Sequence, residues 1–200
     1  MKRKPYSAGA VKFSFWFMEF RKMVSLLGKG MDYDQIRKLN EEQNIFAAAT
    51  KERRLQIFRT VSARVKSLDE SFYVLFLQGD VTTQKQFALA AALAQDTLFF
   101  DFVREVIHEK MLIGDYELTD ADLRIFFHRK QVQDEKAARW TDATILRLGR
   151  SYRTMLAEAG VLEQKKAGAR KIYPPFWDFS TEEWLKQHAM TEIVEALSDR

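Results

Sequence analysis

The residues best suited to chemistry in this chain are basic side chains gathered in one short segment. Residues 50–66, TKERRLQIFRTVSARVK, hold six Lys or Arg residues and a single acid, Glu52. From Arg53 to Leu68 there is no acid, whereas solvated helix faces usually intersperse Glu with Lys. Arginine is suited to bidentate hydrogen bonding with phosphate. This composition favours a phosphate-binding surface, and a solvated helix face is the alternative.

Helical geometry sorts this segment into an apolar face and a polar face. At about 100° per residue over 50–68, apolar side chains share one arc, and a shallow polar strip flanked by basic residues lies opposite. Such a strip predicts a helix that enters a DNA groove, with basic side chains on phosphates and the centre on base edges. The preceding helix, expected at about 33–42, gives helix-turn-helix proportions. The predicted contact residues are Arg53, Gln56, Arg59, Thr60, Arg64 and Lys66.

A second basic block follows later in the chain. A helix expected over 142–159 carries arginines opposite its apolar arc, and a short basic hairpin, 161–174, follows it. A helix followed by a basic hairpin resembles the helix-plus-wing half of a winged helix, and a solvated helix with a loose charged turn is the alternative. The candidate DNA-binding residues here are Arg147, Arg150, Arg153, Lys165, Lys166, Arg170 and Lys171.

Signals for catalysis, metals and cofactors are weak. The three histidines, His108, His128 and His188, stand alone, and cysteine is absent. The acids of GDYELTDAD lack the glycine and terminal glutamate of a calcium loop, so loop and cap roles are favoured. No nucleotide-binding glycine motif occurs. We therefore expect no enzyme activity, no metal site and no cofactor.

Helical periodicity dominates the chain, and three prolines and eight glycines leave few breaks. The pattern predicts an all-α fold of two packed helical lobes, with helix-turn-helix-like elements and one short β-hairpin near the C-terminus. The lobes are expected at 1–79 and 80–200. The first helix is expected over 11–27, and its FSFWF segment is expected in the core or at an interface, in preference to a base-stacking surface. Caps are expected at Thr50, at Thr82 or Thr83, and at Thr141.

Composition places the protein among cytoplasmic globular chains. The net charge is +4 and the pI about 9.2, a mild indication of a polyanionic partner. The longest apolar run, Phe87–Ala94, is far shorter than the roughly 18 residues that a membrane-spanning helix needs. We therefore expect no membrane association.

Several stretches together resemble one bacterial family. They are YSAG (6–9), GDVTTQKQFALAAAL (79–93), GDYELTDADLRIFF (114–127), WTDATILRLGRSYRTMLAEAGVL (140–162) and YPPF (173–176). Their order and spacing are similar to the BrxA family, small accessory subunits of BREX bacteriophage-defence systems. The resemblance spans nearly the whole chain, and none of its motifs is catalytic.

The resemblance implies a helical accessory protein that binds double-stranded DNA and acts with other BREX subunits, which carry out the modification chemistry. Likeness of the family to the antitermination factor NusB keeps RNA binding open. A protein–protein adaptor is the rival class, docked through its basic residues on an acidic subunit with the aromatics at 13–17 forming the contact. No residue-level motif maps from the family, so the candidate residues above derive from charge and periodicity alone.

Overall fold

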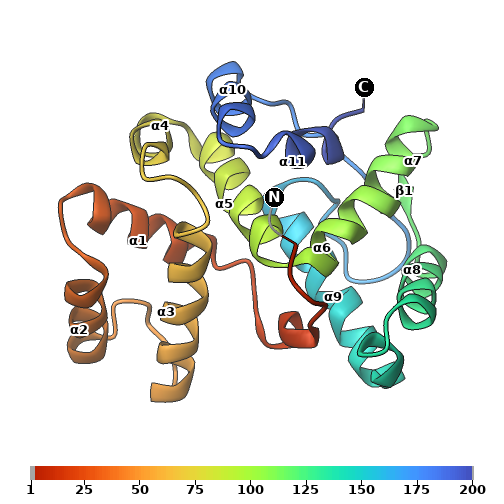
Figure 1. Ribbon diagram of the computed structural model, residues 1–200, viewed down its shortest axis with the longest axis horizontal. Helices are drawn as coiled ribbons and strands as arrows, with labels where there is room; N and C mark the ends of the chain where they lie inside the picture. Colours follow the sequence, from red (N-terminus) through yellow and green to blue (C-terminus); the bar gives the residue numbers. More distant parts are fainter. Residues whose placement is uncertain (1–2, 200) are drawn as a thin grey trace.

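Helices make up most of the part of the chain that the computed structural model describes, residues 3–199 (Figure 1). The helical elements are η1 (Ala8–Lys12), α1 (Phe17–Gly28), α2 (Tyr33–Gln43), α3 (Lys51–Val65), α4 (Phe72–Gln78), α5 (Val81–Gln95), α6 (Thr97–Phe102), η2 (Val103–His108), α7 (Glu109–Leu112), α8 (Asp120–Gln133), η3 (Ala137–Arg139), α9 (Asp142–Ala159), α10 (Phe179–Gln187) and α11 (Thr191–Ala196). A two-stranded antiparallel sheet joins β1 (Glu117–Leu118) to β2 (Arg170–Lys171). The all-α class with short β-pairing near the C-terminus is confirmed.

Side-chain caps fix where most helices begin. Thr50 accepts a hydrogen bond from Arg53 N at the start of α3, and Thr141 accepts one from Thr144 N at the start of α9, as predicted. Helix α5 begins two or three residues earlier than predicted, because Asp80 and not Thr82 or Thr83 supplies the cap. Each such cap stabilises its helix by about 1 kcal/mol.

The predicted first helix, 11–27, is wrong in one respect, because the chain breaks it into η1 and α1. Residues 13–16 between them are not helical, and Trp16 adopts a left-handed backbone with φ of 52°. That conformation places the Phe15 and Trp16 side chains in the core, where each is less than a tenth exposed. Burial of large aromatic surface outweighs the local cost of a left-handed residue, which is of order 1–3 kcal/mol.

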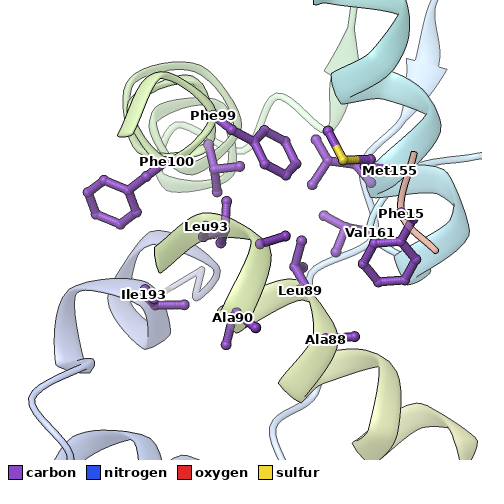
Figure 2. Packing of buried hydrophobic residues seen from close by; sticks show 14 of the residues in the cluster. Phe15, Ala88, Leu89, Ala90, Leu93, Phe99, Phe100, Met155, Val161 and Ile193 are labelled. Atoms are coloured by element: carbon purple, nitrogen blue, oxygen red, sulfur yellow. The ribbon is translucent and has the colours of Figure 1, made fainter. Parts of the chain in front are cut away.

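Helix α5 is the centre of the molecule. Its residues Phe87–Leu93 are all buried, so the helix is enclosed around its whole circumference. Figure 2 shows its Ala88, Leu89, Ala90 and Leu93 among side chains from α6, α9 and α11. The alanines of α5 let these neighbouring helices approach closely.

The predicted division into residues 1–79 and 80–200 stays a prediction. In Figure 1, α1–α3 lie on one side of α5 and α6–α9 on the other. The N-terminal segment crosses this division, since Lys4 N donates to Thr97 Oγ1 at 2.8 Å and η1 packs against α9. One cluster of buried apolar residues runs through both parts.

The basic hairpin is present, with a partner that the sequence did not indicate. Leu162 forms a single antiparallel bridge with Ile172, and Tyr173 N donates to Val161 O at 2.8 Å. The loop before α8, where β1 lies, adds a further strand by pairing Glu117 with Lys171. The hairpin is therefore held against the body of the protein at its base.

Gly149 of α9 lies against the Leu123 and Phe127 side chains of α8. A Cβ built at this buried position would lie 2.7 Å from Leu123 Cδ2 of α8. We expect Gly149→Val to lower the free energy of unfolding by about 1–3 kcal/mol, because overpacking outweighs the gain in helix propensity. Urea denaturation measures the loss. Arg150→Ala, at the exposed neighbouring position, should change stability by less than about 0.5 kcal/mol, and an equal loss in both variants would contradict the packing argument.

Candidate nucleic-acid interface

Arg53 of α3 and Arg150 of α9 line the same depression, of about 290 Å³. Its remaining lining comes from residues 11–14, Ser151 and Thr154. We call this depression the basic groove. In Figure 1 the N-terminal segment passes between α3 and α9, and it adds Lys12 to the groove. The two basic blocks predicted from the sequence therefore meet on one surface.

The guanidinium of Arg53 is held in place by several contacts. Its Nη1 donates to Lys12 O at 2.9 Å and to Gln56 Oε1 at 2.8 Å. Its Cζ lies 4.8 Å from the centre of the Trp16 ring, within cation–π range. Trp16 of the non-helical segment 13–16 thus helps to orient the Arg53 guanidinium at the groove. Gln56, predicted as a DNA-contact residue, instead accepts a hydrogen bond from Arg53.

The basic groove continues toward the hairpin. Thr154 also lines the neighbouring depression, together with Lys165, Lys166 and Arg170. Lys165 Nζ donates to Ala169 O at 3.2 Å within the hairpin, and both lysines are exposed. A single acid, Glu158, lines this part, and burial raises the pKa of its carboxyl. Cations therefore predominate along a path from α3 across α9 to the hairpin.

Arg64 departs from its predicted position. It is 5% exposed, and its Nη1 donates to Ser14 O at 3.0 Å and to Phe15 O at 2.6 Å. Burial lowers the pKa of Arg64 to about 10, so the guanidinium stays charged at neutral pH. The expectation that Arg64 faces a phosphate on the outer surface is wrong. Its side chain instead satisfies carbonyls released where the helix between η1 and α1 is broken.

The sequence predicted that the polar strip of α3 enters a DNA groove, but the strip is also not free to do so. Thr60 and Ala63 line a cavity whose opposite wall is the N-terminal segment, and Arg59 lies at the same cavity. Ser67 Oγ donates to Arg64 O at 2.6 Å. The strip therefore faces the molecule's own N-terminal segment, because residues of η1 line the same cavity as Thr60 and Ala63. The helix-turn-helix interpretation of α2 and α3 stays a prediction.

Four other predicted residues lie outside the basic groove. The Nζ of Lys66 lies 4.2 Å from the Tyr33 ring centre, and Arg153 forms an ion pair with Asp120. Arg147 is exposed on α9, and Lys171 is exposed in β2. Lys12 is the functional candidate that the sequence prediction missed. Only its basic charge pointed to it, because periodicity placed it within a continuous helix.

Residues 3–199 contain no group of three or more His, Asp or Glu side chains arranged to hold a metal ion. His108 Nδ1 lies 3.0 Å from Ser198 O, and the His188 ring stacks on Trp184. Asp122 completes the capping box of α8 with Thr119, the cap role predicted for the acids of that loop. Within the same residues, no helix is long and apolar enough to span a bilayer.

Fold and groove define a small α-helical protein with a cationic depression between helices from the two halves of its chain. Comparison with known proteins narrows this class. The BrxA family model matches residues 4–189. A BREX protein BrxA of Bacillus cereus (strain H3081.97) is 37% identical over 170 residues, which cover 85% of this chain and 84% of that protein.

The chain belongs to the BrxA family, whose members are components of BREX phage-defence systems. Its fold is also that of an uncharacterized protein from Magnetospirillum magneticum known from a crystal structure. That structure superposes with a TM-score of 0.80 at 18% identity, covering 98% of this chain and 100% of that one. At this identity the similarity concerns the fold alone.

Proposed function

We propose that this protein is a non-catalytic, cytoplasmic accessory protein of a BREX system that binds double-stranded DNA along its basic groove. The observation that supports the proposal is the meeting of Arg53 and Arg150 in one depression that continues to Lys165 and Lys166. Clustered cations on one face attract the phosphate backbone independently of sequence.

Phosphate contacts dominate in this proposal, and sequence preference is weak. The groove offers guanidinium and ammonium groups together with the Ser151 and Thr154 hydroxyls, all of which suit phosphate oxygens. Base-edge readout needs side chains that project into a DNA groove. The polar strip of α3 faces the N-terminal segment, so it adds little such readout.

A salt series on the unmodified protein tests the proposal. If Lys12, Arg53, Arg150, Lys165 and Lys166 each neutralise a phosphate, the slope of log affinity against log salt is about −4 to −5. Fluorescence anisotropy with a labelled duplex measures this slope. Absence of binding at low salt, or affinity indifferent to salt, would contradict the proposal. Tighter binding to an RNA duplex of the same sequence would favour the RNA alternative.

Docking on another BREX subunit is a second candidate function, favoured by two exposed phenylalanines. Phe176 is 86% exposed and lies between β2 and α10, and Phe179, the first residue of α10, is 77% exposed. Exposed aromatic side chains are typical of protein–protein contacts. Of the aromatics at 13–17, Phe15 and Trp16 are buried and cannot form such a contact. Co-purification with co-expressed BREX subunits, compared between the unmodified chain and Phe176→Ala/Phe179→Ala, tests this function.

A further inference from the structure

A separate cavity of about 310 Å³ shares only Phe13 with the lining of the basic groove. Its walls are the N-terminal segment, α3 and the junction of α5 with α6. Much of the lining is apolar and includes Phe13, Phe99 and Met155. Ligand-binding cavities have volumes of about 300–1,000 Å³, so this one suits a single small molecule. We call it the Arg64 cavity, after the buried cation in its wall.

Arg64 is a buried charge without a bonded counterion. It forms no salt bridge with any residue in the range 3–199, and its hydrogen bonds to Ser14 and Phe15 go to neutral carbonyls. Its Nη2 contacts Met155 Sδ at 3.7 Å, and a thioether is a weak acceptor. Fully buried arginines are almost always paired with an acid. Because Nη2 of Arg64 contacts only this weak acceptor, the guanidinium has donor capacity left for an anion in the cavity.

A second guanidinium serves the same cavity. Arg59 precedes Arg64 on α3 by five residues, about 1.4 turns; it lines the cavity and is exposed to solvent. Two arginines of one rigid helix can hold the oxygens of a phosphate between them. The ring of Phe13, which is partly exposed, offers an aromatic surface on which a planar ring can stack.

We propose that the Arg64 cavity binds a phosphate monoester carried on a planar ring, the chemistry of a mononucleotide. Arg59 and Arg64 hold the phosphate, and the ring lies against the apolar wall. A free nucleotide and the 5′-terminal nucleotide of a strand both present this chemistry. The proposal does not rest on duplex binding, because Arg53, Arg150 and Lys165 are not part of this cavity.

Asp96 lines the cavity as well and opposes an anion there. Burial raises the pKa of Asp96 to about 6, against the opposing effect of its hydrogen bond from Phe99 N and of the nearby Arg64. At neutral pH its carboxylate therefore repels a bound phosphate. Asp96→Asn removes this repulsion and retains an oxygen that can accept from Phe99 N, so the variant should bind the ligand more tightly.

Isothermal titration calorimetry of the full chain with adenosine 5′-monophosphate tests the proposal. Adenosine and inorganic phosphate are the fragment probes, and each should bind at least about tenfold more weakly than the nucleotide. We expect Arg59→Ala to weaken nucleotide binding by about tenfold or more, the effect of losing one charge-assisted hydrogen bond. Asp96→Asn should tighten it several-fold. Arg147→Ala, which removes an exposed arginine that lines neither cavity nor groove, should leave it unchanged.

Absence of nucleotide binding, or binding that neither Arg59→Ala nor Asp96→Asn alters, would overturn the proposal. So would loss of nucleotide binding in the variant Arg150→Glu/Lys165→Glu/Lys166→Glu, because the nucleotide would then occupy the basic groove. Retained nucleotide binding in this variant, with duplex binding lost, supports both sites separately. Competition by a 5′-phosphorylated oligonucleotide but not its 5′-hydroxyl form identifies a strand end as the source. Failure of both to compete identifies a free nucleotide.

Discussion

Duplex DNA binding is expected to fall by at least about a hundredfold at low salt in the variant Arg150→Glu/Lys165→Glu/Lys166→Glu. These three side chains are exposed on α9 and on the hairpin, and each flanks a depression lined by cations. Reversing them removes three phosphate contacts and introduces repulsion, so the salt slope should also shrink by about 3. Exposed substitutions change stability by less than about 0.5 kcal/mol each, so the fold is retained. Anisotropy titrations at several salt concentrations give both quantities.

A matched control separates the groove from the overall charge of the molecule. Arg104, Lys136 and Lys186 are exposed and line neither the basic groove nor the Arg64 cavity. Reversal of all three to Glu makes the same change in net charge. At 0.1 M salt, long-range attraction alone is screened beyond about 10 Å, so in titrations at that salt concentration this control should lose less than about threefold in affinity. Equal losses in the two triple variants would show that DNA does not select the groove.

Local signals made the helices predictable. Thr50, Thr119 and Thr141 each begin a helix through a hydrogen bond to a nearby backbone amide, and Gly160 ends α9 with φ of 88°. These interactions involve residues three or four apart, so the sequence contains all the information needed. The break at Trp16 has no such signal, because a bulky aromatic residue is rarely left-handed and only its tertiary packing holds it there.

The candidate site was predictable in composition but not in arrangement. Charge segregation indicated two basic blocks, and both Arg53 and Arg150 lie in the groove. A helical wheel gives the direction in which Arg64 projects from α3 but not the groups that it meets there. In the structure its guanidinium donates hydrogen bonds to the Ser14 and Phe15 carbonyls. Likewise Lys12 joins the groove only because η1 packs against α9. These placements depend on contacts between residues distant in the chain.

Loss of the Asp101 carboxylate should destabilise the protein by about 3–5 kcal/mol. Asp101 is 1% exposed and accepts from Tyr6 Oη at 2.6 Å and from Arg3 Nη2 at 2.8 Å, while Lys130 Nζ lies 3.7 Å away. Arg3 is half-exposed, so its ion pair adds little. The larger effect comes from Lys130, which is 3% exposed, because Asp101→Ala leaves this buried cation without one of its two acids.

Two comparisons test whether the buried charge accounts for the loss. Glu105, the other acid on Lys130, is exposed, so Glu105→Ala should lower the unfolding free energy by only about 1 kcal/mol. The double variant Asp101→Ala/Lys130→Met removes both charges and should recover part of the loss, since the buried cation that has lost one of its two acids is then gone as well. Urea denaturation measures all three variants. A loss in Asp101→Ala no larger than in Glu105→Ala would show that the N-terminal segment, and not the charge on Lys130, is what Asp101 secures.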